Sequence, residues 1–174
     1  MVTFHGTSYI IADMDSHDTR GQRIALIGCG KKKADTPQKA INLYTGNLFR
    51  LSVQYARHMG CDRIFIMSAL HGLVPAEKVI APYNLKLSEL SAAQVRKWGE
   101  RVLHQIRSVS DPRVDFYLLL AGEQYIKNLR LHLDNHLAPL TGKPLGIRLA
   151  WMKHQVAQET NKGETHGQGD QEAD

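Results

Sequence analysis

A histidine, a tyrosine and an asparagine lie close together in the segment 68–85, which carries the side chains best suited to chemistry. His71 can donate a hydrogen bond to a leaving group or orient a water molecule. Tyr83 can stack on a ring, and the amide of Asn84 can read the edge of a nucleobase. A single histidine is more often structural, and a Pro-Tyr pair is often only a packed turn. Taken together, the residues favour a functional segment, which we interpret as a loop forming the floor of a pocket.

The run Lys31, Lys32 and Lys33 follows a Gly-Cys-Gly turn at residues 28–30. Glycines let the backbone approach a phosphate closely and lysines supply point charges for it, so the run is a candidate anion site. The alternative is a solvated surface loop. The spacing of a Walker motif is absent. Cys29 within the turn could be a nucleophile, but no activating base can be assigned to it, and a small buried residue is the favoured role.

Two carboxylates could support positive charge or orient water. Glu123 follows Ala-Gly at the start of a predicted helix, where the helix dipole alone favours an acidic residue, so a structural role is the alternative. Asp35 lies two residues beyond the lysine run. Neither Cys29 nor Cys61 belongs to a Cys-x-x-Cys pair, and the nine histidines show no ligand spacing. We therefore expect neither a metal nor an organic cofactor.

Three apolar runs predict the buried strands that must position these residues. They cover residues 23–28, 64–67 and 114–120. Apolar residues at helical spacing predict helices over residues 48–59, 91–106 and 149–158, and a short helix over 121–133. The second helix starts at the capping box Ser91-Ala92-Ala93-Gln94. Strands that alternate with helices predict a three-layer α/β fold with a mostly parallel sheet, whose strand-exit loops share one edge.

The composition of the 174 residues, 43% of them hydrophobic, fits a single domain, which we assign to residues 1–160 with its core at about 22–158. The composition of residues 161–174 predicts a disordered acidic tail. Two cysteines cannot form a disulfide framework and no apolar run is long enough to cross a bilayer, so we expect a cytoplasmic location. A net charge of +5 and a pI of about 9.3 permit a polyanionic partner.

Five short motifs occur in order between about Ile24 and Tyr125. They are Cys29-x-x-x-Lys33, Leu43-Tyr44-Thr45-Gly46-x-x-Phe49, Ser68-Ala69-x-x-Gly72-Leu73, Pro82-Tyr83-x-Leu85-x-Leu87 and Ala121-Gly122-x-x-Tyr125. The series resembles the YaaA-related small-domain family, and its pocket loop is similar to that of a domain of archaeosine synthase. This resemblance implies a fold of the uracil-DNA-glycosylase type.

The same resemblance extends to the Brig-type anti-phage DNA glycosylases, which remove glucosylated hydroxymethylcytosine from phage DNA. It implies an enzyme that flips out and excises a modified base and leaves an abasic site. We expect phage DNA with modified bases as the partner, no membrane partner, and a monomer. The alternatives are a base-modifying transferase and a non-catalytic DNA-binding stress protein, and fold analogy alone does not choose among them.

The predicted site residues fall into three groups. The catalytic candidates are Asn84, His71, Glu123 and Asp35; the base-binding candidates are Tyr44, Tyr83, Ser68, Gly72 and Tyr125; the phosphate-binding candidates are Lys31, Lys32, Lys33 and Arg50. Asn84 stands where the family pattern leads us to expect Asp. If that carboxylate is a general base, the chain has an altered mechanism or is inactivated, whereas a position that only reads a base edge can use Asn.

Overall fold

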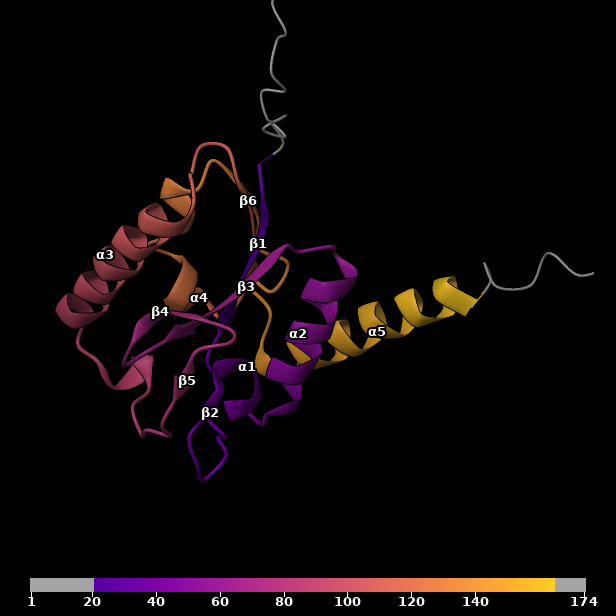
Figure 1. Cartoon of the computed structure of the whole chain (residues 1–174), viewed down its shortest axis with the longest axis horizontal. Helices are drawn as coiled ribbons and strands as arrows, with labels where there is room; N and C mark the ends of the chain where they lie inside the picture. Colours follow the sequence, from indigo (N-terminus) through magenta and orange to yellow (C-terminus); the bar gives the residue numbers. More distant parts are fainter. Residues whose placement is uncertain (1–20, 165–174) are drawn as a thin grey trace, which may run out of the picture.

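The computed structural model describes the backbone of residues 21–164 and the side chains of residues 21–158 (Figure 1). Its main sheet has five strands in the order β4-β3-β1-β6-β7. The bounds are β1 Arg23–Gly28, β3 Arg63–Ser68, β4 Gly72–Pro75, β6 Phe116–Leu120 and β7 Asn135–Leu137. Neighbouring strands pair in parallel, except that β4 runs antiparallel to β3. The predicted α/β class with a mostly parallel sheet is confirmed.

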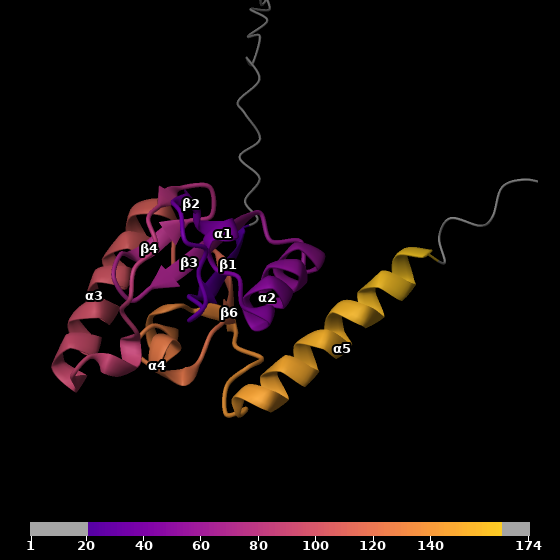
Figure 2. The same cartoon turned by 90° about the horizontal axis from the view of Figure 1, so that it is seen from below.

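Helices cover both faces of this sheet, which gives three layers (Figures 1 and 2). One side carries α3 (Ala92–Val109) and the short α4 (Glu123–Ile126), and the other carries α1 (Ala40–Leu43), α2 (Asn47–His58) and α5 (Leu145–Glu164). The alternation along β1 explains the two cores: Leu26 packs with the α3 side, whereas Ile27 packs with the α2 side.

The segment 68–74 is a hairpin rather than the open loop that the sequence predicts. Ser68 at the end of β3 pairs with Gly72 at the start of β4, and Leu73 and Val74 are buried in that strand. Gly72 has a φ of +73°, which L side chains rarely adopt, so the glycine permits the tight return of the chain. A second small sheet pairs β2 (Gln38–Lys39) with β5 (Val79–Ile80).

Most helix boundaries follow the predicted signals. Gly60 follows α2 with a φ of +66°, and the Ser91 hydroxyl accepts a hydrogen bond from the Gln94 backbone at the start of α3. The helix predicted over 121–133 is wrong in extent, because α4 ends at Ile126 and only a 3₁₀ turn, Arg130–His132, follows. A further 3₁₀ turn covers Leu87–Glu89.

The last helix, α5, begins four residues before the predicted start and continues to Glu164. It therefore includes residues 161–164 of the predicted tail, and residues 165–174 lie outside the described part of the chain. None of the helices described is both long and apolar enough to span a membrane.

Candidate functional site

The three strand-exit loops share one edge of the sheet, as the sequence predicts. In the parallel registers, Gly28 of β1 lies beside Met67 of β3, and Ile27 lies beside Leu120 of β6. The backbone N–H of Cys29 also donates a hydrogen bond to the Met67 carbonyl at 3.1 Å. The loops after β1, β3 and β6 are thereby held at the carboxyl edge, where open α/β sheets bind ligands.

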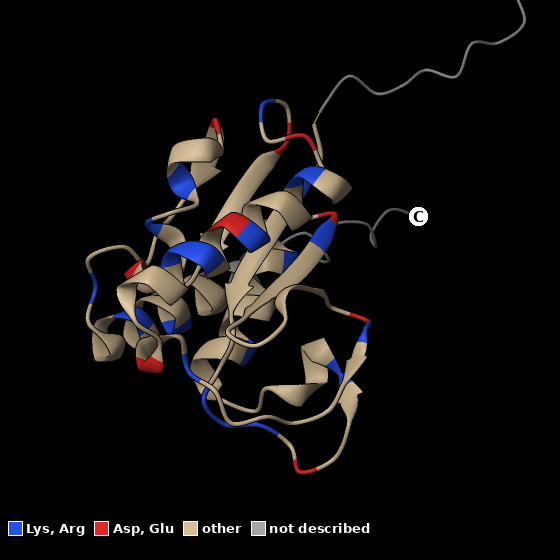
Figure 3. Ribbon diagram, turned by 90° about the vertical axis from the view of Figure 1, so that its left-hand side faces the viewer, with Lys and Arg blue, Asp and Glu red and all other residues tan. Residues whose placement is uncertain are grey.

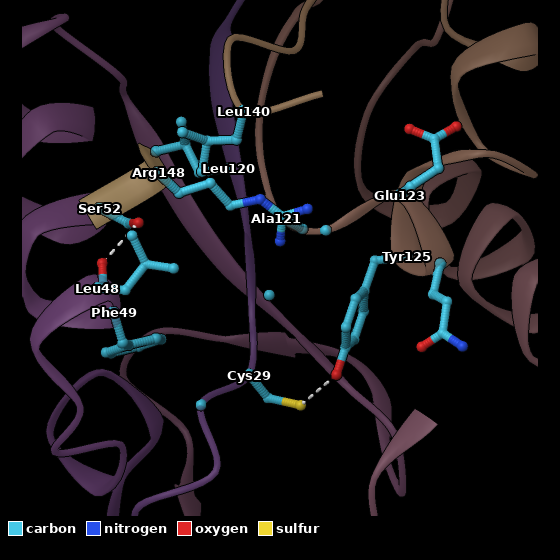
Figure 4. Close-up of a pocket in the computed structure, with 14 residues that line it drawn as sticks. Cys29, Leu48, Phe49, Ser52, Leu120, Ala121, Glu123, Tyr125, Leu140 and Arg148 are labelled. Carbon is cyan, nitrogen blue, oxygen red and sulfur yellow. Dashed lines mark hydrogen bonds between the residues drawn. The ribbon is translucent and has the colours of Figure 1, made fainter. Parts of the chain in front are cut away.

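A cavity of about 410 Å³ opens at this edge (Figure 4). The loop after β1 supplies Cys29 and Gly30 to its wall, and the first turns of α2 supply Phe49. The loop and helix after β6 supply Glu123 and Tyr125. The opposite wall includes Leu48, Ser52, Leu140 and Arg148. The cavity therefore combines aromatic and aliphatic walls with one carboxylate and one guanidinium.

Two charged side chains of the cavity wall carry polar atoms without partners. The Glu123 carboxylate places one oxygen 3.1 Å from Nη2 of Arg130, while its Oε2 is buried and makes no hydrogen bond to the described residues. Nε of Arg148 is likewise buried and unpartnered within the described part of the chain. The Arg148 guanidinium lies over Gly122, where a Cβ atom would come within 2.9 Å of Nη1. Buried polar atoms usually find partners, so these atoms are candidate ligand contacts.

Two other lining residues, Cys29 and Tyr125, contact each other, with 3.1 Å between Sγ and Oη (Figure 4). The Tyr125 ring also packs edge-on against Trp98 with centroids 5.6 Å apart. The Trp98 indole N–H donates to the Ser68 carbonyl at 2.8 Å. These contacts connect the cavity wall to the end of β3 and fix the orientation of the Tyr125 ring.

A second cluster is centred on Tyr83, which is close enough to Cys29 to interact with it electrostatically. The Ser68 hydroxyl donates to the Tyr83 Oη at 2.8 Å, and the two phenol oxygens of Tyr44 and Tyr83 are 2.9 Å apart. His71 packs edge-on against the Tyr83 ring at 5.4 Å, and Nζ of Lys33 lies 4.4 Å from the centre of that ring. The sequence-predicted residues Lys33, Tyr44, Ser68, His71 and Tyr83 are therefore brought together.

Burial shifts the pKa values of this cluster. It raises the pKa of Tyr44 to about 12 and also raises that of Tyr83, so both phenols stay protonated at neutral pH. Burial lowers the pKa of Lys33, against an opposing effect of Cys29. Burial, together with Lys78 and Arg101, lowers the pKa of His71, whose imidazole is therefore mostly neutral at pH 7.

Several predicted residues lie elsewhere, which corrects the expectation that the segment 68–85 forms the floor of the pocket, because none of its residues lines this cavity. Asn84 and Asp35 are exposed, do not line the cavity, and make no hydrogen bond among the residues described. Tyr44 is only 1% exposed and packs against Phe49, so its ring cannot stack on a base. Gly72 is buried. The Gln105 side chain occupies the space where a Cβ atom of residue 72 would lie, so there is no room for a base beside this glycine.

Among the phosphate-binding candidates, Lys31, Lys32 and Arg50 are exposed. Of the cavity residues, Glu123 and Tyr125 were predicted, whereas Phe49 was recognised only as part of a motif and Arg148 was missed. The signal for Arg148 was an earlier helix start, since α5 begins at Leu145 and places the arginine in its first turn. Among the side chains described, those of residues 21–158, no group of three His, Cys, Asp or Glu residues is arranged to hold a metal ion.

The fold and the cavity define an α/β protein with a cavity at the carboxyl edge of its sheet. The chain belongs to a family of unknown function, DUF6884, whose model matches residues 24–154. That match runs from β1 into the middle of α5 and so includes the whole wall of the cavity named above. No curated protein and no solved structure matches the chain.

Proposed function

We propose that this protein is a DNA glycosylase that flips a modified nucleobase into the cavity at the carboxyl edge and excises it, leaving an abasic site. The observation that carries this proposal is the cavity itself, with Phe49 and Tyr125 in its walls beside the loop that carries Lys31 and Lys32. Its volume of about 410 Å³ lies within the range of about 300–1,000 Å³ typical of small-molecule sites. A flipped base is held in such a pocket, between aromatic or apolar side chains.

In this proposal, the basic loop after β1 binds the phosphates of the DNA backbone. Gly30 lines the cavity, and the exposed Lys31 and Lys32 follow it directly, so phosphates beside a flipped nucleotide lie within their reach. Because Tyr44 does not line the cavity, the stacking role falls to Tyr125, and Phe49, which is only 4% exposed, forms part of the apolar wall. Unstacking the target base costs a few kcal/mol, which phosphate contacts and stacking offset.

Excision places positive charge on the sugar and negative charge on the departing base. The Glu123 carboxylate, whose Oε2 has no partner among the described residues, supports the oxocarbenium-like sugar and orients the attacking water. Arg130 holds its other oxygen. Arg148 donates hydrogen bonds to the base as its bond to C1′ breaks. The water oxygen then bonds to C1′ and loses a proton to the Glu123 carboxylate, and this proton passes through solvent to the departing base and neutralises it.

Incubation of the pure protein with DNA duplexes and single strands carrying different modified bases tests this function. Alkali then cleaves any abasic site, and mass spectrometry identifies the product. Free base with alkali-labile breaks is the expected result. A mass gain on the DNA would indicate a transferase, and retention of the DNA without chemistry would indicate a binding protein. Because the proposed substrate is phage DNA inside the cell, the proposal places the protein in the cytoplasm.

A further inference from the structure

Lys33 differs from its two lysine neighbours in its surroundings. Lys31 and Lys32 are exposed, whereas Lys33 is half-buried and its backbone bridges to that of Tyr44. Its Nζ lies 3.4 Å from the Gly30 carbonyl and 4.4 Å from the centre of the Tyr83 ring. Since Gly30 is part of the cavity wall, the amine lies next to that wall, although Lys33 itself is not one of the lining residues.

The contacts of this amine leave it available for reaction. Among the described residues, Lys33 forms no ion pair with a carboxylate that would keep it an ammonium ion. The rings of Tyr83 and Tyr44 cover part of it, and this burial lowers its pKa. A larger neutral fraction makes a lysine a better nucleophile toward carbonyl carbon.

We propose that Lys33 gives the protein a second activity, cleavage of the DNA strand at an abasic site through a Schiff base on its amine. This inference rests on the proposed function, because base excision in the cavity whose wall includes Gly30, next to Lys33, supplies the abasic sugar. The substrate class is therefore a 2-deoxyribose whose ring has opened to an aldehyde. The lysine acts on that sugar after the base has left.

The step balances without a co-reactant. The Lys33 nitrogen attacks C1′ of the aldehyde, and loss of water gives a protonated imine. A base removes a proton from C2′, the electron pair forms the C2′–C3′ double bond, and the C3′–O bond breaks with the phosphate of the downstream strand as leaving group. The base that we propose for this proton is the imidazole of His71, which packs edge-on against the Tyr83 ring over which the Lys33 amine lies. Hydrolysis of the imine releases Lys33 and an unsaturated aldehyde.

Borohydride trapping on DNA with a preformed abasic site tests this activity without any need for excision. The wild-type protein should give a covalent protein–DNA adduct, because borohydride reduces the imine to a stable amine. K33R keeps the charge but cannot form the imine, so the adduct should disappear. K153R, at an exposed position on α5, is the matched control and should trap as the wild type does.

Peptide mapping of the wild-type adduct provides a readout that does not depend on a variant folding. A deoxyribose remnant on Lys33 supports the inference, and a remnant on any other amine overturns it. Absence of trapping by a protein that excises a modified base overturns the lyase and leaves the glycosylase intact. Trapping on Lys33 by a protein that excises none of the tested bases contradicts the proposed function alone.

Discussion

At the scale of single residues, the charge of Glu123 should determine the rate of excision. E123Q keeps the size of the side chain and removes the charge that supports the sugar. We expect the single-turnover rate to fall about 10²–10³-fold, the loss typical of removing one preorganised electrostatic group, with DNA affinity little changed. D35N alters an exposed carboxylate outside the cavity wall and should leave the rate unchanged. A full-rate E123Q enzyme would remove Glu123 from the mechanism.

At Asn84 the family resemblance and the structure lead to different expectations: the resemblance implies a catalytic carboxylate at this position, whereas the structure places the side chain outside the cavity. Its side chain is exposed and lies outside the cavity wall, so N84D should excise a modified base at the wild-type rate. The comparison uses single-turnover kinetics on one cleavable duplex. A faster N84D enzyme would restore the carboxylate role that the resemblance implies for this position, and a slower one would indicate that the amide reads a base edge.

The pH dependence of trapping distinguishes Lys33 from an ordinary surface lysine. Burial lowers the pKa of its amine from the usual 10.5. Because the neutral amine is the nucleophile, adduct formation should decrease as the pH falls through the lowered pKa. It should also reach its plateau at a lower pH than the amine of an exposed lysine would. Initial trapping rates across a pH series measure this, and a midpoint at 10.5 would show that the amine is ordinary.

At the scale of elements, the β3–β4 hairpin holds Ser68 and His71 beside Tyr83, and Gly72 permits its return. G72A would place a Cβ atom in a left-handed conformation and against Gln105, whose Oε1 accepts the Leu73 N–H at 2.8 Å. We expect a decrease of about 1–3 kcal/mol in the free energy of unfolding, measured by urea denaturation.

Gly60 provides the matched control for that substitution. Its φ of +66° is similar, but a Cβ atom there would have open space around it. G60A should therefore carry only the conformational cost of about 1 kcal/mol, which is smaller than that of G72A. Equal decreases for the two variants would show that the Gln105 side chain adds nothing at the hairpin.

At the scale of the whole molecule, the layers follow from local sequence signals. The strands β1, β3 and β6 are continuous apolar runs, and α3 begins at a capping box, so each is recognisable without its neighbours. By contrast, β4 and β7 have four and three residues, which are too short for periodicity to identify. Their place depends on pairing with strands already formed.

The site was predictable only in part, for a related reason. Strand order brings Glu123 and Tyr125 to the same edge as the lysine loop, and that could be inferred from the alternation of strands and helices. The position of Arg148 over Gly122 depends on where α5 starts and how it packs on α2. The burial of Tyr44 depends on its packing against Phe49. Apart from the earlier start of α5, neither arrangement has a signal in the local sequence.

The charge of the whole molecule leads to a prediction about DNA binding. Basic residues occur on several helices and loops of the described chain (Figure 3), so the lysine loop should account for only part of the affinity. Replacing the exposed Lys31 and Lys32 together with Ala should lower the slope of log K against log salt by about 0.9 for each duplex phosphate that the variant no longer neutralises. K33A should change this slope less, because its half-buried amine lies over Tyr83 rather than in solvent. Titrations at several salt concentrations measure the slopes, and K153A is the control. An unchanged slope for the double variant would show that Lys31 and Lys32 stay in solvent and do not contact DNA phosphates.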